Sequence, residues 1–459
     1  MRFTVVTYGS EGDTRPFVAL CRGLMASGHE VRLFAEGSSI HNAHSHGVPA
    51  ETLAGNIRST LPLDNPMQEL GRSDVIAAIK AGLRVVNENT PAWMRAVTKD
   101  ARGGDAVLFS GLASPVGSTV AEELKKPGIA LWLQPTSPTR EFASPTLRSV
   151  KLPGWLNRLS YCVSPQAMIR RMYGKSSDAA RAAVFADARA RRPKREFPIL
   201  YGFSGHLVPR PDDWPESHRI CGHWTLPPHD WEPSAALLDF LSAGPPPLYV
   251  GFGAISSFVR QKGLSAIKAA IGDRRTLFSP GWSRITTDML PKNFFVLGDT
   301  PHVWLFPLTS MVIHHAGAGT THTAARSGVP SIPLPFGVDQ FFWAARLAAA
   351  GVAPRYMAGT RIDAKSLGAM IEFAGEPGVR KRARMLGQAI TEEDGIANAV
   401  AAIESAMRSG EPIIARPMNV RRRAHCTPAD AACSGASMTI ARGVVRRSQE
   451  QRKSPHPDH

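Results

Sequence analysis

Short runs of hydrophobic residues recur along this chain, and longer segments with the 3.6-residue spacing of amphipathic helices separate them. A helix between consecutive strands returns the chain to the same edge of a sheet, so this alternation predicts parallel strands in an α/β fold. The clearest strands of the first half lie at 3–8, 31–35, 106–110 and 129–134. Those of the second half lie at 248–252, 276–279, 294–297, 311–314 and 331–335.

The chain has 459 residues, about three times the usual length of one domain, so two globular domains are expected. A stretch rich in proline and tryptophan, between Arg210 and Pro233, separates the two halves and is typical of a linker. After Met407, arginine, serine and proline predominate without apolar periodicity, which indicates a tail outside the fold.

Composition narrows the class of protein. With 43% apolar and 20% charged residues, the chain has the make-up of a globular protein and not of a disordered one. The sequence contains no apolar run of membrane-spanning length, and its five cysteines lack a Cys-x-x-Cys pair, which argues against disulfide and zinc frameworks. These features predict a cytoplasmic protein.

The net charge of +16 is unevenly distributed. Residues 140–219 contain 15 Lys and Arg against 7 Asp and Glu, and residues 409–459 contain 9 against 4. Aromatic residues do not alternate with these charges as they do in nucleic-acid binders, so we expect no nucleic-acid partner. Weak peripheral contact of the basic segments with an anionic membrane, and hence membrane association, stays open as an alternative to a solvated surface.

The first segment with chemical potential is the glycine turn GSEGDTRP, between the strand at 3–8 and a helix expected at 17–26. Asp13 lies in this turn, at the carboxyl end of the strand, where ligand clefts form in α/β domains. Its spacing allows two interpretations: a helix cap or a catalytic acid.

The second segment is HHAGAGTT, residues 314–321, where a strand passes through a glycine turn into a helix expected at 321–327. This arrangement points backbone N–H groups at a phosphate, and His315, Thr320 and Thr321 add side-chain donors, so we expect a diphosphate here. Asp339 and Gln340 follow a proline and glycine loop and suit the hydroxyls of a sugar. The sequence contains no Asp-x-Asp pair of the kind that clamps a metal on such a diphosphate, so no metal is expected.

With these motifs the chain resembles the GT-B nucleotide-sugar glycosyltransferases, in the bacterial natural-product and sterol-glucosyltransferase-like branch of the UDP-glycosyltransferase family. The resemblance covers residues 1–407 and rests on GSEGDTRPFVALCRGLMASGHEV, HHAGAGTT, PFGVDQFFWAARL and the EDG at 393–395. It implies an α/β fold of GT-B architecture, in which two doubly wound Rossmann-like domains face a central cleft.

The resemblance also implies the domain organisation. The expected parts are an acceptor-binding domain at 1–215, a linker at 216–245, a donor-binding domain at 246–385, a helix packing back on the first domain at 386–408, and a basic tail at 409–459. Ala316 stands where the family has glycine, and we expect it to keep a negative φ.

Site roles follow from the matched motifs. Asp13 is the expected catalytic base. The expected donor-binding residues are Gly253, Trp282, His315, Gly317, Gly319, Thr320, Thr321, Asp339 and Gln340. The expected acceptor-binding residues are Gly12, Pro135, Thr136 and Phe142.

The implied activity is an inverting, metal-independent transfer of a hexose, with glucose from UDP-glucose expected first, to a hydroxyl of a lipophilic acceptor. Sterols, polyketide or antibiotic aglycones and glycolipid precursors all fit the acceptor. The UDP-sugar is a co-substrate, and no cofactor is expected. Two alternatives remain: a nucleotide-sugar 2-epimerase of the same architecture and a non-catalytic binding protein of the same fold.

Overall fold

The computed structural model describes residues 1–56, 72–147, 152–185, 196–228, 231–253, 261–281 and 285–408. Apart from Glu196, all of these residues belong to one compact unit. The predicted tail at 409–459 and Trp282 lie outside the described residues. Within the described ranges, no helix is both long and apolar enough to cross a membrane.

The first sheet has seven strands in the order β3-β2-β1-β4-β5-β6-β7, and every neighbouring pair is parallel. The strands are β1 (Arg2–Val6), β2 (Glu30–Glu36), β3 (Ala50–Leu53), β4 (Ala106–Ser110), β5 (Gly128–Trp132), β6 (Ile199–Tyr201) and β7 (His218–Ile220). All residues of β4 and β5 are buried, as expected for central parallel strands covered on both faces.

The second sheet has five parallel strands in the order β10-β9-β8-β11-β12. They are β8 (Leu248–Gly251), β9 (Thr276–Ser279), β10 (Phe294–Val296), β11 (Met311–His314) and β12 (Ser331–Pro333). In both sheets the order reverses beside the first strand, between β1 and β4 and between β8 and β11. Doubly wound folds bind ligands at the carboxyl ends of the strands at such points, so β1 and β11 lead into the two turns of interest.

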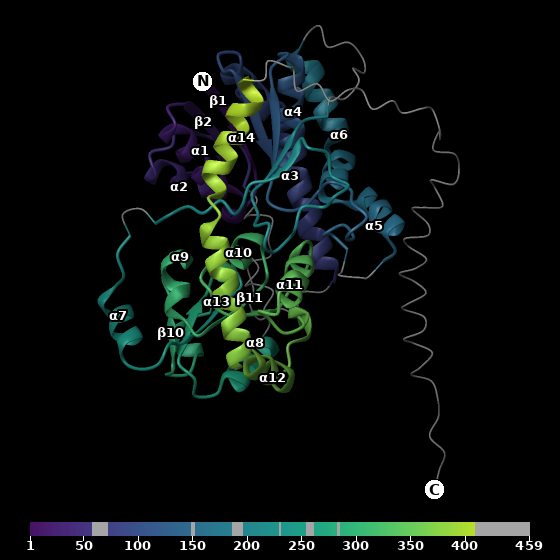
Figure 1. The fold of residues 1–459 in the computed structure, drawn as a ribbon. Helices are drawn as coiled ribbons and strands as arrows, with labels where there is room; N and C mark the ends of the chain where they lie inside the picture. Colours follow the sequence, from purple (N-terminus) through teal and green to yellow (C-terminus); the bar gives the residue numbers. More distant parts are fainter. Residues whose placement is uncertain are drawn as a thin grey trace. The chain divides into compact units, whose positions relative to one another are not determined.

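Helices alternate with the strands along the chain (Figure 1). Those of the first half are α1 (Glu11–Ala26), α2 (Ile40–Ser45), α3 (Arg72–Ala101), α4 (Ser114–Glu123), α5 (Gly154–Ser160) and α6 (Pro165–Val184). Those of the second half are α7 (Ala235–Ser242), α8 (Gln261–Ile271), α9 (His302–Leu305), α10 (Ala318–Arg326), α11 (Gln340–Ala349), α12 (Ala364–Gly375), α13 (Pro377–Glu392) and α14 (Gly395–Arg408).

The last helix packs on the first one. Val400 and Ile403 of α14 share a buried cluster with Phe17 and Leu20 of α1, and Figure 1 shows the two helices side by side. A Cβ on Gly23 of α1 would lie 2.3 Å from Ile396 Cγ2, so only glycine allows this approach. The C-terminal helix thus helps to hold the helix that carries Asp13.

The predicted α/β class with two parallel sheets is confirmed, and β4, β9 and β11 have the predicted bounds. The strands β3, β6 and β7 were not predicted, because β6 and β7 have only three residues each and β3 and β7 are partly exposed. β7 and α7 lie within the stretch expected as a linker, and residue 386 falls inside α13. The domain boundaries drawn from the sequence stay predictions.

Candidate functional site

Asp13 is fixed in the turn between β1 and α1. Its Oδ2 accepts hydrogen bonds from the backbone N–H of Ser10 at 2.9 Å and from Ser10 Oγ at 3.0 Å. Helix α1 therefore begins at Glu11, and the expectation of a helix starting at 17 is wrong, because Ser10 and Asp13 form a capping box that starts it earlier. A Cβ on Gly9 would lie 2.4 Å from Asp13 Oδ2, so glycine is required for the carboxylate to fold back here.

Two carboxylates from distant parts of the chain influence each other in this region. Asp13 is exposed, yet desolvation by the dense protein around it raises the pKa of its carboxyl, against the two hydrogen bonds from Ser10. Burial raises the pKa of Asp339 to about 6, and the negative charge of Asp13 contributes to that rise. Asp13 and Asp339 are thus brought within electrostatic reach, although 326 positions separate them in the chain.

The turn between β11 and α10 leaves its helix N-terminus open. Gly317 is the N-cap of α10 and offers no side chain, so the first N–H groups of the helix lack a side-chain cap. The helix begins at Ala318, three residues before the predicted start. Ala316 has a φ of +61°, so the expectation of a negative φ there is wrong: the tight turn after His314 imposes a left-handed backbone on a non-glycine residue.

Several side-chain donors at this turn are buried and unpaired. Within the described part of the chain, Thr321 Oγ1, His315 Nδ1 and His314 Nε2 have no hydrogen-bond partner. Burial lowers the pKa of His315 to about 4, so the ring is neutral at pH 7. Buried donors without partners are uncommon. An anion at the α10 N-terminus would give the uncapped N–H groups of the helix an acceptor.

Two glycines hold the His315 ring in place. A Cβ on Gly317 would lie 2.4 Å from His315 Nε2, and a Cβ on Gly253 would lie 3.4 Å from its Cε1. The ring therefore fits between the backbones at the ends of β8 and β11. At Gly319 an added Cβ would have no described atom within 4 Å, so there is room beside the first turn of α10.

Asp339 and Gln340 brace the loop that leads into α11. Gln340 Oε1 accepts hydrogen bonds from the backbone N–H groups of Phe336 at 2.8 Å and Gly337 at 3.2 Å. Trp343 Nε1 donates to Asp339 Oδ2 at 2.9 Å. Each of the two side chains thus uses a polar atom to hold this part of the chain in place.

The predicted acceptor-binding residues occupy different surroundings. Gly12 lies exposed in the first turn of α1. Pro135 and Thr136 are buried, and Thr136 Oγ1 lies 3.4 Å from Tyr201 Oη. The rings of Phe142 and Phe342 are 5.5 Å apart, and the Arg346 guanidinium stands 4.5 Å from the Phe142 ring centre. Of the four, only the exposed Gly12 and the partly buried Phe142 are accessible to a ligand.

Sequence reasoning gave no role to two residues that shape the site. Trp343, fully buried, orients Asp339, and its place four residues later, one helical turn on, was a readable signal. Arg15 belongs to the same GSEGDTRP motif as Asp13, and its Nε is buried without a partner among the described residues.

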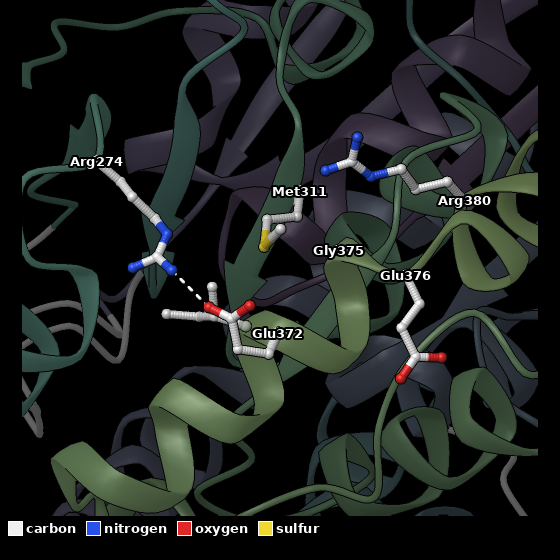
Figure 2. Close-up of a pocket in the computed structure, with 7 residues that line it drawn as sticks. Arg274, Met311, Glu372, Gly375, Glu376 and Arg380 are labelled. Carbon is white, nitrogen blue, oxygen red and sulfur yellow. Dashed lines mark hydrogen bonds and ion pairs between the residues drawn. The ribbon is translucent and has the colours of Figure 1, made fainter.

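A pocket of about 390 Å³ lies at the amino ends of the strands of the second sheet, away from the β11–α10 turn (Figure 2). Met311, the first residue of β11, lines it, together with Arg274 and Glu372, whose side chains form an ion pair of 2.5 Å. Figure 2 shows these two side chains facing each other across the pocket. None of the predicted site residues lines it, so we do not assign the ligand to this pocket.

Residues 3–142 match the glycosyltransferase family 28 N-terminal domain, and residues 278–403 match the C-terminal domain of erythromycin biosynthesis protein CIII-like proteins. O-mycaminosyltylonolide 6-deoxyallosyltransferase of Streptomyces fradiae is 30% identical over 425 residues, which cover 88% of this chain and 97% of that protein. Sterol 3-beta-glucosyltransferase UGT80B1 of Arabidopsis thaliana is 28% identical over 417 residues, covering 87% of this chain and 67% of that protein. The structure of glycosyltransferase VinC in complex with dTDP superposes with a TM-score of 0.58 at 15% identity, covering 89% of this chain and 100% of that one.

Proposed function

Because the chain belongs to the GT-B glycosyltransferases, we propose that it moves a hexose from a nucleoside diphosphate sugar, UDP-glucose first, to a hydroxyl of a lipophilic acceptor. Relatives named for a macrolide and for sterols support an acceptor of that kind. The observation that carries the proposal is the pairing of a carboxylate with raised pKa, Asp13, with an open helix N-terminus at Gly317 and Ala318.

Asp13 acts as the general base. An acceptor hydroxyl donates its proton to the Asp13 carboxylate while its oxygen forms a bond to the anomeric carbon of the sugar. The bond from that carbon to the diphosphate oxygen breaks, and its electron pair leaves with the diphosphate. A single displacement of this kind inverts the anomeric configuration. The raised pKa makes the carboxylate a stronger base than an ordinary aspartate.

The β11–α10 turn binds the leaving diphosphate. The N–H groups of α10, the hydroxyls of Thr320 and Thr321 and the neutral ring of His315 all donate hydrogen bonds. Gly319 leaves room for the diphosphate, and Gly253 and Gly317 contribute to the site by accommodating the His315 ring. These donors stabilise the charge that develops on the leaving oxygen. Asp339 and Gln340 bind sugar hydroxyls.

Three further assignments complete the proposal. Trp282, which lies outside the described residues, is assigned to nucleobase binding on the family resemblance alone. Gly12 and Phe142 border the acceptor site, and Pro135 and Thr136 support it from beneath. Residues 1–215 bind the acceptor, and residues 246–385 bind the donor.

The test is an incubation of the purified protein with UDP-glucose and dTDP-glucose, each with a sterol and with a macrolide aglycone, read by mass spectrometry. The proposal predicts an acceptor heavier by one hexose, formed by wild type and lost in Asp13→Asn. It also predicts that a chelator leaves the rate unchanged. Epimerisation of the donor without acceptor would establish the 2-epimerase alternative. Binding of neither donor in calorimetry would leave the non-catalytic alternative.

A further inference from the structure

Arg15 has a buried guanidinium nitrogen, Nε, with no hydrogen-bond partner among the described residues. It follows Asp13 by two positions on α1. Glu11, one turn before it, is the natural ion-pair partner on a helix, but its carboxylate lies 3.9 Å from His41 Nε2 instead. A buried guanidinium nitrogen loses its hydration and calls for an acceptor.

Arg15 lies near elements that belong to the second half of the chain. Helix α1 contacts α10, whose N-terminus forms the proposed diphosphate site. The positive charge of Arg15 helps burial to lower the pKa of His302 to about 3. His302 Nε2 forms a hydrogen bond of 2.8 Å with Tyr249 Oη on β8. The charge of His315 also lowers the pKa of His302. Arg15 therefore lies near His302, which in turn lies near His315 of the β11–α10 turn.

The groups already assigned to the diphosphate are all uncharged. Burial lowers the pKa of His315 to about 4 and that of His314 to about 3, so both rings are neutral at pH 7. Hydroxyls and backbone N–H groups are neutral, and the dipole of α10 is equivalent to about half a charge. A diphosphate with two or more negative charges needs a fuller counter-charge than these groups supply.

We propose that Arg15 binds the β-phosphate of the nucleotide-sugar donor through its guanidinium. The planar guanidinium matches two phosphate oxygens at once. It reaches the diphosphate from the helix that also carries the base, so one helix serves both the bond that forms and the bond that breaks. This inference rests on the proposed diphosphate site of the second sheet.

The experiment titrates UDP and UMP into wild type, Arg15→Ala, Arg15→Lys and Arg22→Ala by calorimetry. Arg22 is the matched control, since it is seven residues further on the same face of α1, about 10 Å along the helix axis. We expect Arg15→Ala to weaken UDP by about 10- to 150-fold, and UMP, which lacks the β-phosphate, to bind as in wild type. Arg15→Lys keeps the charge, so its UDP affinity should lie between those of wild type and Arg15→Ala. Arg22→Ala should bind UDP and UMP as wild type does.

Equal weakening of UDP and UMP by Arg15→Ala would overturn the inference, because it would indicate a disturbed fold or nucleoside site. So would unchanged UDP affinity in both Arg15 variants. His315→Ala in the same series distinguishes failure of the Arg15 inference from failure of the proposed diphosphate site. If it weakens UDP while Arg15→Ala does not, only the Arg15 inference fails. If neither variant weakens UDP, the proposed diphosphate site fails with it.

Discussion

The two turns that follow β1 and β11 are built alike and end differently. In each, a buried parallel strand passes through a glycine turn into a helix, and the helix positions correspond: Ser10 and Gly317 are the N-caps, and Asp13 and Thr320 are the third helical residues. In the first turn, the Asp13 carboxylate accepts from the Ser10 N–H. In the second, no side chain caps the helix, and Thr321 Oγ1 is unpaired within the described ranges.

We propose that this difference lets one supersecondary unit serve two chemical roles. A helix N-terminus attracts negative charge whatever its source. Where the chain supplies a carboxylate, as at Asp13, that carboxylate occupies the end of the helix, and in the proposed reaction it takes the acceptor proton. Where the chain supplies none, as at α10, the helix end can bind an anion from a ligand. The predictions below alter one turn and use the other for comparison.

The largest effect is expected for Asp13→Asn. The amide keeps the shape and can still accept from Ser10, but it cannot take the acceptor proton, so the transfer rate should fall by about 10²- to 10⁴-fold. In wild type, the rate should rise with pH through the raised pKa of Asp13, because only the ionised carboxylate is a base. Rate measurements across pH check both. Asp105→Asn, which changes a carboxylate bound to the Arg2 N–H at the start of β4, is the control.

The second prediction compares glycines at the same helical position. Gly12 and Gly319 are both second residues of their helices, and neither has a described atom within 3.4 Å of an added Cβ. Gly319→Ala should weaken UDP by about 5- to 150-fold, since its methyl group enters space that the diphosphate needs. Gly12→Ala should bind UDP as wild type does. Equal UDP affinities for the two variants would place the diphosphate elsewhere.

The third prediction concerns the stability of Asp339→Asn. The folded-state pKa of Asp339 is raised from 3.8 to about 6, so its stabilising contribution is complete below about pH 4 and is lost as pH rises through 6. An asparagine stays neutral throughout. Urea unfolding should therefore show the variant more stable than wild type by about 1 to 3 kcal/mol at pH 8, and equal to it near pH 4. A variant less stable at pH 8 would contradict the raised pKa.

The smallest effect is expected for Ala316→Gly, at the tight point of the second turn. Relief of the left-handed backbone, about 1 to 2 kcal/mol, opposes the loss of a buried methyl group and the flexibility of glycine, which together cost a similar amount. The free energy of unfolding should change by less than about 1 kcal/mol. A larger loss in urea titrations would show that the buried methyl group contributes more stability than the relieved backbone strain returns.

The reverse change at Gly9, to alanine, should destabilise the first turn, because the added Cβ would clash with Asp13.

Much of the fold was readable because buried parallel strands are written as continuous apolar runs, as in β4 and β11. Edge strands such as β7 bury little, so their sequence carries no such signal. Helix starts were placed too late in both turns. In the first, the capping box of Ser10 and Asp13 begins the helix at Glu11, six residues before the predicted start.

The site was readable only as separate motifs. The sequence marked Asp13 and Asp339 individually, but their mutual influence depends on tertiary packing, which neither motif contains. The left-handed backbone of Ala316 was missed for a similar reason: the geometry of the turn outweighs the preference of the residue. The burial of Thr136 depends on Tyr201, 65 positions later, and has no local signature.

We propose that the β1–α1 turn supplies the base and the β11–α10 turn binds the diphosphate. Titration of UDP into Asp13→Asn and His315→Ala tests this assignment most directly. Loss of one hydrogen bond from His315 to a charged oxygen should weaken UDP by about 10- to 150-fold, while Asp13→Asn should bind UDP as wild type does and transfer no sugar. Unchanged UDP affinity in His315→Ala, or an equal loss in both variants, would contradict the assignment of base and anion site to these turns.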